Sequence, residues 1–202
     1  MDTFVINLER RPDRLKKFAL SAKLAQVDFK VVDAVDGKLL SNKNYNWITK
    51  YDNLDKIRYL KKGEIGSYLS HYKCFENSTT DHVLIFEDDA KIPIDFKYQL
   101  NLLLSKVPKD FDVLLLGTTN LWNRKYKDEK KIIWKDDYFF KYDGDVYGLQ
   151  SYLLSRKAIN ALLDCKYPID GPNDCKFSNS GLKYYIVNKN LVNLNRMGSD
   201  SQ

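Results

Sequence analysis

Three consecutive carboxylates, Glu87, Asp88 and Asp89, are the residues of this chain best suited to chemistry. They follow a short apolar run at 83–86, which is typical of a buried strand in a mostly parallel sheet. Acids at the carboxyl end of that strand would lie at the sheet edge where open α/β folds bind ligands. Because neighbouring carboxylates repel one another, they favour a bound cation, and their oxygen atoms suit Mg²⁺ or Mn²⁺. A solvated acidic turn is the plainer interpretation of the same residues.

Basic side chains near the start of the chain could bind an anionic group at the same edge. Arg11 and Arg14 follow an apolar run at 4–8, and guanidinium groups there suit a diphosphate or a carboxylate such as Asp36. No GxGxxG turn follows this run, which argues against a dinucleotide site. His71 lies on an expected helix, where it either packs in the core or contacts a ligand.

Alternating strands and helices are needed to bring these side chains together. Apolar runs and helical periodicity predict strands at 4–8, 29–32, 83–87, 111–117, 148–155 and 184–187, and helices at 11–25, 63–77, 96–107 and 156–163. Asp95 and Ser155 are expected to cap the last two helices. Two short apolar runs around a turn at 136–137 predict an antiparallel hairpin. We therefore expect a single α/β domain over residues 1–202, with a mostly parallel sheet flanked by helices.

Composition narrows the classes of protein and partner. The net charge of +6, from 33 Lys and Arg against 27 Asp and Glu, favours anionic partners such as nucleotides or, peripherally, an anionic membrane surface. It falls short of the basic face that nucleic-acid binding needs. Three cysteines without a CxxC pattern argue against zinc and a disulfide framework. No signal peptide and no apolar stretch of about 20 residues is found, so we expect a cytoplasmic protein.

The order of several segments resembles glycosyltransferase family 25, which includes bacterial lipooligosaccharide β-galactosyltransferases and galactosyltransferases that act on collagen hydroxylysine. The most specific segment is Gly63-Glu64-Ile65-Gly66, which precedes the acidic triplet by about twenty residues. The matching segments, in order, are Ile6-Asn7-Leu8 with Arg11 and Arg14, Asp36-Gly37, Gly63 to Gly66 with Leu69-Ser70-His71, Phe86 to Asp89, Leu116-Gly117, Gln150 to Ser155, and Pro168-Ile169-Asp170. One departure is Ser67, where the family often has cysteine.

The resemblance implies a GT-A (Rossmann-like) fold and transfer of a hexose with inversion. The donor would be a UDP-sugar, with UDP-galactose the first expectation and UDP-glucose the second, and the acceptor a glycan or protein hydroxyl. Mn²⁺ or Mg²⁺ would bind to Glu87 and Asp89. The residues expected to bind the donor are Asn7, Leu8, Arg11, Arg14, Asp36, Gly66, His71, Glu87, Asp88, Gly117 and Gln150.

Inverting transfer also requires one base that takes the proton of the acceptor hydroxyl. Asp170 is the candidate, because Pro168 and Pro172 flank it and it lies far along the chain from the acidic triplet. A turn-capping role is the structural alternative for Asp170. Asp174 and Asp145 are the next acids to consider.

Two other functions compete with glycosyl transfer. A metal-dependent phosphohydrolase would use the acidic triplet to activate water, but it would want further metal ligands, and the only histidines are His71 and His82. A non-catalytic nucleotide-binding or glycan-binding module is the other alternative, and the intact acidic triplet argues against it.

Overall fold

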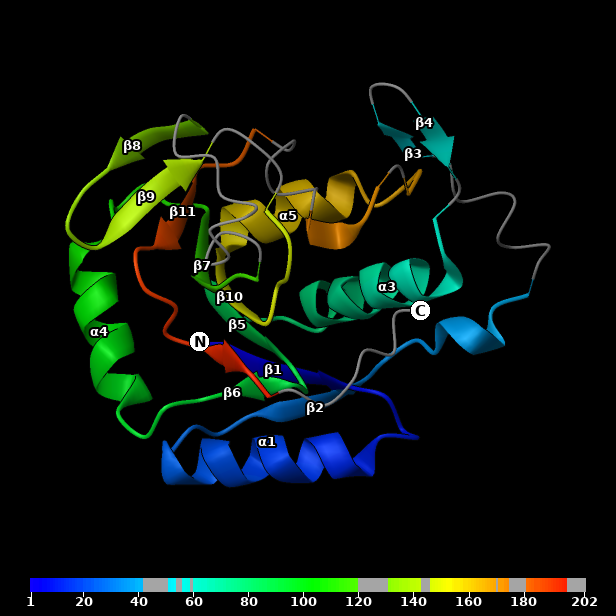
Figure 1. The fold of residues 1–202 in the computed structure, drawn as a ribbon, viewed down its shortest axis with the longest axis horizontal. Coiled ribbons are helices and arrows are strands. Elements are labelled where there is room, and N and C mark those ends of the chain that lie inside the picture. The colour runs from blue at the N-terminus through cyan, green and yellow to red at the C-terminus, as the bar shows by residue number, and fades with distance from the viewer. Residues whose placement is uncertain are drawn as a thin grey trace.

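The structure, a computed structural model, describes residues 1–41, 60–119, 131–142, 146–169, 171–174 and 181–195, together with the backbone of 51–53 and 56–58. An eight-stranded mixed sheet runs through its centre in the order β2-β1-β5-β10-β7-β11-β9-β8 (Figure 1). Its strands are β1 (Asp2–Asn7), β2 (Lys30–Asp33), β5 (His82–Glu87), β7 (Val113–Gly117), β8 (Ile132–Lys135), β9 (Phe139–Tyr142), β10 (Ser151–Ser155) and β11 (Tyr184–Val187).

Six of these strands point the same way. Strand β1 is parallel to β2 and β5, and β11 is parallel to β7, whereas β10 runs antiparallel between β5 and β7. The predicted hairpin is β8–β9, which extends the sheet because β9 pairs with β11 in antiparallel register. The expected mostly parallel α/β sheet with a small antiparallel hairpin is therefore confirmed.

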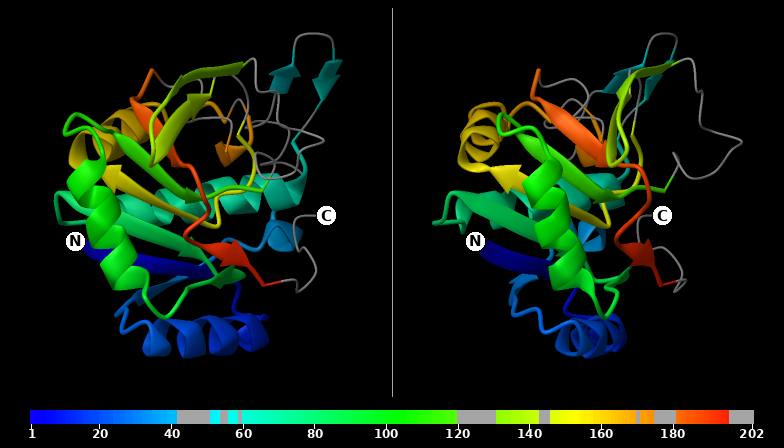
Figure 2. Two further views of the ribbon diagram at one scale, coloured as in Figure 1. Left: turned by 60° about the vertical axis from the view of Figure 1, so that its left-hand side comes forward. Right: turned by 90° about the vertical axis from the view of Figure 1, so that its left-hand side faces the viewer.

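Helices cover both faces of the sheet (Figure 2). Helices α3 (Lys62–Glu76) and α5 (Arg156–Asp164) share one apolar core with inward residues of β1, β5, β7 and β10. Helices α1 (Pro12–Leu24) and α4 (Phe96–Lys106) pack through a second core on the opposite face. Successive strand residues face alternate sides, so the strands of the centre, buried on both faces, are apolar throughout. None of the helices in the described ranges combines the length and apolar composition that a membrane crossing needs.

The two predicted helix caps have different outcomes. Ser155 caps α5, since its hydroxyl oxygen accepts the backbone N–H of Ala158 at 3.2 Å. Asp95 occupies the residue before α4, but its side chain accepts no helical backbone N–H. It accepts the side-chain amide of Gln99 at 2.7 Å instead, so the predicted capping bond of Asp95 is wrong.

Small additional elements flank the carboxyl edge of the sheet. They are the 3-10 helix η1 (Gly37–Leu39), the antiparallel pair β3 (Tyr51–Asn53) and β4 (Lys56–Arg58), and the antiparallel pair β6 (Ala90–Lys91) and β12 (Asn193–Leu194). The last pair matters most for the acidic triplet, because β6 follows it directly. The backbone N–H of Asn195 also donates to the carbonyl of Asp89 at 2.6 Å. Residues 191–195 therefore hold the turn that carries the acids.

Candidate active site

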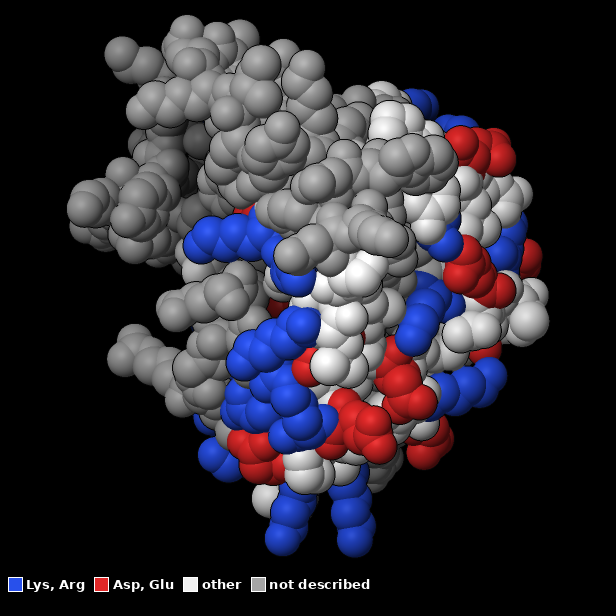
Figure 3. Space-filling view, turned by 90° about the vertical axis from the view of Figure 1, so that its right-hand side faces the viewer, with Lys and Arg blue, Asp and Glu red and all other residues white. Residues whose placement is uncertain are grey.

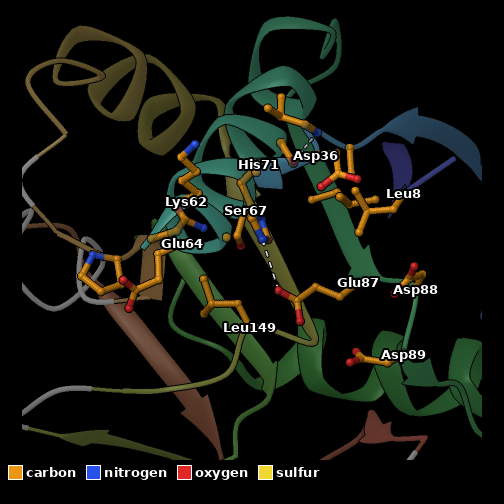
Figure 4. A pocket seen from close by; sticks show the side chains of 18 of the residues that line it. Leu8, Asp36, Lys62, Glu64, Ser67, His71, Glu87, Asp88, Asp89 and Leu149 are labelled. Atoms are coloured by element: carbon orange, nitrogen blue, oxygen red, sulfur yellow. Dashed lines mark hydrogen bonds and ion pairs between the residues drawn. The ribbon is translucent and has the colours of Figure 1, made fainter. Parts of the chain in front are cut away.

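A cavity of about 590 Å³ opens at the carboxyl ends of β1, β2 and β5, beside the first turns of α3. Lys62, Glu64, Ser67 and His71 reach it from α3, and the acidic triplet lies across from them (Figure 4). Its lining includes seven residues predicted for the site, namely Leu8, Arg14, Asp36, His71, Glu87, Asp88 and Asp89. The structure therefore brings together, at one sheet edge, residues from four separate parts of the chain.

Asp88 is buried and fully engaged by protein groups. One carboxylate oxygen accepts the side-chain amide of Asn7 at 2.7 Å, and the other accepts the guanidinium of Arg14 at 2.8 Å. Burial raises the pKa of Asp88, while the charge of Arg14 acts in the opposite direction. All three side chains are buried, so this cluster fixes the turn after β5 to the end of β1 and the start of α1.

Asp89 has a different environment from its neighbour. Arg14 lies 3.6 Å from its Oδ2, and its buried Oδ1 has no hydrogen-bond partner among the described residues. Burial and the nearby charge of Glu87 raise the pKa of Asp89 to about 7. Glu87 is half-buried and accepts a contact from His71 Nε2 at 3.4 Å. The carboxylates of Glu87 and Asp89 thus meet at the cavity, where the positive charge of Arg14 only partly offsets their repulsion.

These groups fit a divalent cation held largely by the substrate. Within the described ranges, no three His, Cys, Asp or Glu side chains come close enough to form a complete metal site. Mg²⁺ and Mn²⁺ are commonly bound by one or two carboxylates together with water and substrate phosphates. The partnerless Oδ1 of Asp89 and the half-exposed carboxylate of Glu87 supply that oxygen-only donor set. Asp88 does not, because both of its oxygens are occupied.

Basic side chains also line the cavity, among them neighbours of Asp36 and Glu64. Arg10, Lys38, Lys61 and Lys62 line it, and Lys and Arg side chains gather on the face shown in Figure 3. The guanidinium of Arg10 donates to Asp36 at 2.6 Å, and this hydrogen bond lowers the pKa of Asp36. We expected Arg11 or Arg14 to pair with a carboxylate such as Asp36, but the arginine that pairs with Asp36 is Arg10.

The other two predicted arginines have separate roles. Arg14 pairs with Asp88 and Asp89, as the expectation of a carboxylate partner required. Arg11 pairs with Asp13 on the first turn of α1, at 3.0 Å, and does not belong to the described lining of the cavity. Two arginines three positions apart therefore differ in burial and in surroundings, because Arg11 precedes α1 with a non-helical backbone, whereas Arg14 lies in the first turn of α1 and is buried.

Close packing places α3 against the cavity. A Cβ at Gly66 would lie 2.5 Å from the carbonyl oxygen of Val35 and 2.8 Å from the nitrogen of Gly37, so only glycine fits there. The hydroxyl of Ser70 accepts the N–H of Val35 at 2.8 Å. Gly66, predicted to bind the donor, thus acts in the structure by letting the helix approach the loop after β2.

Two further predicted donor residues lie behind the cavity wall. A Cβ at Gly117 would lie 2.3 Å from the carbonyl oxygen of Val192, so this glycine admits the chain that leads to β12. Gln150 is buried, and its side-chain amide lies against the carbonyls of Gly117 at 3.3 Å and Gly148 at 3.0 Å. Neither residue belongs to the described lining. Their predicted contacts with a donor remain predictions.

The predicted base lies outside the described residues, and so does Asp145. The neighbours of Asp170 on the chain are described: Ile169 is buried, and Pro172, Asn173 and Asp174 line the cavity. The carboxylate of Asp174 accepts the backbone N–H of Gly148 at 3.2 Å. The segment that carries the candidate base therefore leads into the cavity.

Sequence reasoning missed several lining residues. Lys61 and Lys62 stand directly before Gly63, and this lysine pair next to the most specific matching segment was a signal that could have found them. Tyr152, whose hydroxyl lies 2.5 Å from His71 Nδ1, gave no such signal, because it reads as one more apolar residue of a buried strand.

Comparison with known proteins gives a family. A sequence model described as glycosyltransferase family 25 (LPS biosynthesis protein) matches residues 1–177. A Bos taurus protein named probable inactive glycosyltransferase 25 family member 3 is 35% identical over 127 residues, covering 57% of this chain and 21% of the relative. Xenopus laevis procollagen galactosyltransferase 1-B is 34% identical over 127 residues, which again cover 57% of this chain and 21% of the relative. The chain spans about a fifth of these relatives.

Solved structures give the fold. An active-site mutant of LgtC superposes with a TM-score of 0.52 at 15% identity, covering 92% of this chain and 72% of that one. The galactosyltransferase LgtC in complex with donor and acceptor sugar analogues gives a TM-score of 0.50 at 15% identity, covering 92% and 73%. At this identity the likeness concerns architecture alone, and it confirms the GT-A fold expected from the sequence.

Proposed function

We propose that this chain, which belongs to glycosyltransferase family 25, transfers a hexose from a UDP-sugar to a hydroxyl group of a glycan or protein. Galactose is the first candidate, because a similar relative is named a procollagen galactosyltransferase. The observation that carries the proposal is the cavity itself. Its lining combines the carboxylates of Glu87 and Asp89, the second with a buried oxygen that has no hydrogen-bond partner among the described residues, with several basic side chains.

Both sets of side chains suit the departure of the diphosphate. In transfer with inversion, the acceptor oxygen forms a bond to the anomeric carbon while the bond from that carbon to the diphosphate breaks. The leaving UDP gains negative charge, which Arg10, Lys61 and Lys62 are placed to offset. A divalent cation held by Glu87 and Asp89 would supply further neutralisation of the diphosphate. Arg14 and Asn7 hold Asp88, and with it the turn that presents both carboxylates.

The acceptor proton must go to a base, and we assign this role to Asp170. Support comes from its neighbours, since Pro172, Asn173 and Asp174 line the cavity. Asp174 is the alternative, because its carboxylate lies at the cavity and accepts the N–H of Gly148. A carboxylate of ordinary basicity suffices, because the proton needs to move only as the new bond forms.

The test is a screen of UDP-hexoses for donor hydrolysis and for transfer, with and without Mn²⁺. We expect Mn²⁺-dependent release of UDP, fastest from UDP-galactose, and growth of product when a hydroxyl acceptor is added. Asp170→Asn should lower transfer by about 100-fold or more with donor affinity nearly kept, since a base acts in the transition state. Asp174→Asn is the matched variant. Hydrolysis of the diphosphate bond to UMP and hexose 1-phosphate, without an acceptor, would instead indicate a phosphohydrolase.

A non-catalytic nucleotide-binding or glycan-binding module is the second candidate. The observation that favours it is the similarity to the bovine relative, whose name describes that protein as probably inactive. The same screen separates the two functions. A binding module would bind UDP with Mn²⁺ and yet release none from any UDP-hexose, with or without an acceptor.

A further inference from the structure

A line of three polar side chains runs from the core to the cavity. Tyr152 on β10 lies within the core, its hydroxyl 2.5 Å from His71 Nδ1 on α3, and His71 Nε2 lies 3.4 Å from the carboxylate of Glu87 at the end of β5. Tyr152 is 0% and His71 1% exposed. Their rings also stack, with centroids 5.6 Å apart. The dashed line between His71 and Glu87 in Figure 4 marks the contact between these two side chains.

Strand register explains why the three side chains meet. Tyr152 is the partner of Ile85 across the β5–β10 pair, and both belong to the core beneath α3. Glu87 is two residues beyond Ile85, so its side chain leaves the same face of the sheet, one step nearer the cavity. The close approach of α3, which Gly66 permits, brings His71 over this point.

The positions of the protons determine which group donates and which accepts each hydrogen bond along this line. An ionised Glu87 can only accept a hydrogen bond, so the contact with His71 requires a proton on Nε2. In the neutral ring Nδ1 is then an acceptor, and the hydroxyl of Tyr152 donates to it. The hydroxyl thereby selects the ring tautomer that donates to Glu87. A phenylalanine would fill the same volume without placing a polar group in the core, and the hydroxyl is explained by His71 together with the side chain of Asn173, which also interacts with it.

We propose that Tyr152 and His71 are a positioning pair that holds the carboxylate of Glu87 in the orientation needed by the cation that accompanies the UDP-sugar. The inference rests on the proposed function, since it concerns the same cavity. It changes the role expected of His71, which supports a cation-binding carboxylate from behind. Side chains that hold a metal ligand in place commonly contribute about 10–100-fold to metal affinity or activity.

Tyr152→Phe is the sharpest variant, because it removes one oxygen atom and keeps the ring. Tyr72→Phe is the matched control: Tyr72 is also fully buried, it is the residue next to His71 on α3, and its hydroxyl has no hydrogen-bond partner among the described residues. The measurement is calorimetric titration of UDP into the full chain at a series of Mn²⁺ concentrations, with melting temperature recorded for each variant.

We expect Tyr152→Phe to raise the Mn²⁺ concentration for half-maximal UDP binding by about tenfold. Tyr72→Phe should leave it within twofold. His71→Phe should raise it more than His71→Gln, whose amide can still donate to Glu87. A merely structural role would lower the melting temperature of Tyr152→Phe without moving its Mn²⁺ requirement, and that result would overturn the proposal. If the unsubstituted chain bound UDP without any Mn²⁺ dependence, the metal-assisted function would itself be wrong, and this outcome is distinct because it needs no variant.

Discussion

The two ends of the central sheet both bury carboxylates, but they treat them in opposite ways. At the amino ends of the strands, Asp2 is 7% and Asp112 2% exposed. Asp2 accepts the backbone N–H groups of Thr79 at 2.8 Å and Thr80 at 3.2 Å, and Lys30 pairs with its other oxygen. The hydrogen bond from Thr79 is the main reason that the pKa of Asp2 is lowered far below its usual range.

At the carboxyl ends, Asp88 and Asp89 share one buried arginine, and the pKa of each is raised. Ionised Asp2 therefore stabilises the folded state at one end of the sheet, whereas ionisation of Asp88 and Asp89 destabilises it at the other end. The difference shows where this fold spends interactions on stability and where it leaves groups ready for a ligand. A carboxylate that is already satisfied has little to offer a cation.

We expect the largest effect from a substitution of Asp89, whose surroundings differ most from those of Asp2. Asp89→Asn should weaken Mn²⁺-dependent UDP binding by more than the ~100-fold that loss of an outer partner can cause. Because the pKa of Asp89 is raised to about 7, its ionisation costs stability in the metal-free chain as pH rises from about 4 to about 7. The variant should lack this slope and melt no lower than the parent at pH 8. Calorimetry and thermal melts over pH 4–8 check both points, and unchanged nucleotide affinity would place the cation elsewhere.

Removal of the shared guanidinium should come next. Arg14→Lys keeps the charge but cannot contact Asp88 and Asp89 with one planar fork, so we expect a loss of about 2–3 kcal/mol in the free energy of unfolding, together with weaker donor binding. Arg11→Lys is the matched control, because its partner Asp13 is exposed and an ion pair with an exposed carboxylate contributes little to stability. Urea denaturation of both variants measures the difference. Equal losses would mean that burial does not separate these two arginines.

At the amino end, Asp2→Asn should cost about 1–2 kcal/mol at pH 7, because it weakens hydrogen bonds to a charged acceptor. Since the folded pKa of Asp2 is lowered, its contribution is present above the unfolded pKa of about 4 and is lost as pH falls below it. The gap between parent and variant should therefore close in acid, which is the reverse of the trend for Asp89. Asp28→Asn, an exposed aspartate, is the control, and a gap independent of pH would contradict the account.

The smallest effect should come from a lysine at the same end. The ammonium of Lys157 lies 3.1 Å from Asp112 but is 73% exposed, and Asp112 also accepts the backbone N–H of Lys183 at 2.9 Å. Lys157→Met should therefore lower the free energy of unfolding by about 0.5 kcal/mol or less. High salt should remove even this difference. A loss above about 1 kcal/mol would show that the backbone donor alone does not satisfy Asp112.

Local patterns predicted the frame of the molecule well. The apolar run before Glu87, the periodicity of 11–25 and the Ser155 cap depend on neighbours within a few residues, and the structure has the expected elements there. The same patterns placed the acidic triplet at the carboxyl edge. Pattern and order of segments together were enough to indicate the family and the fold.

Roles within the site could not be predicted the same way. Asp88 and Asp89 are identical and adjacent, and they differ only through Asn7 and Arg14, which are about eighty and seventy-five positions away. Whether Tyr152 has a partner likewise depends on a helix eighty-one positions distant. Gly66 and Gly117, whose predicted donor contacts remain predictions, admit backbone from elsewhere in the chain. Such distinctions arise from tertiary packing, which no window along the sequence contains.

The clamp formed by residues 191–195 sets an order of events during synthesis. The acidic turn leaves the ribosome early, but the carbonyl of Asp89 and strand β6 meet their partners only when a segment about one hundred residues later has followed. Most strands of the sheet can pair before that time. A chain that ended before residue 191 would thus lack this fastening of the acidic turn, and it would also lack Leu191 and Val192 from the core on the side of α1 and α4.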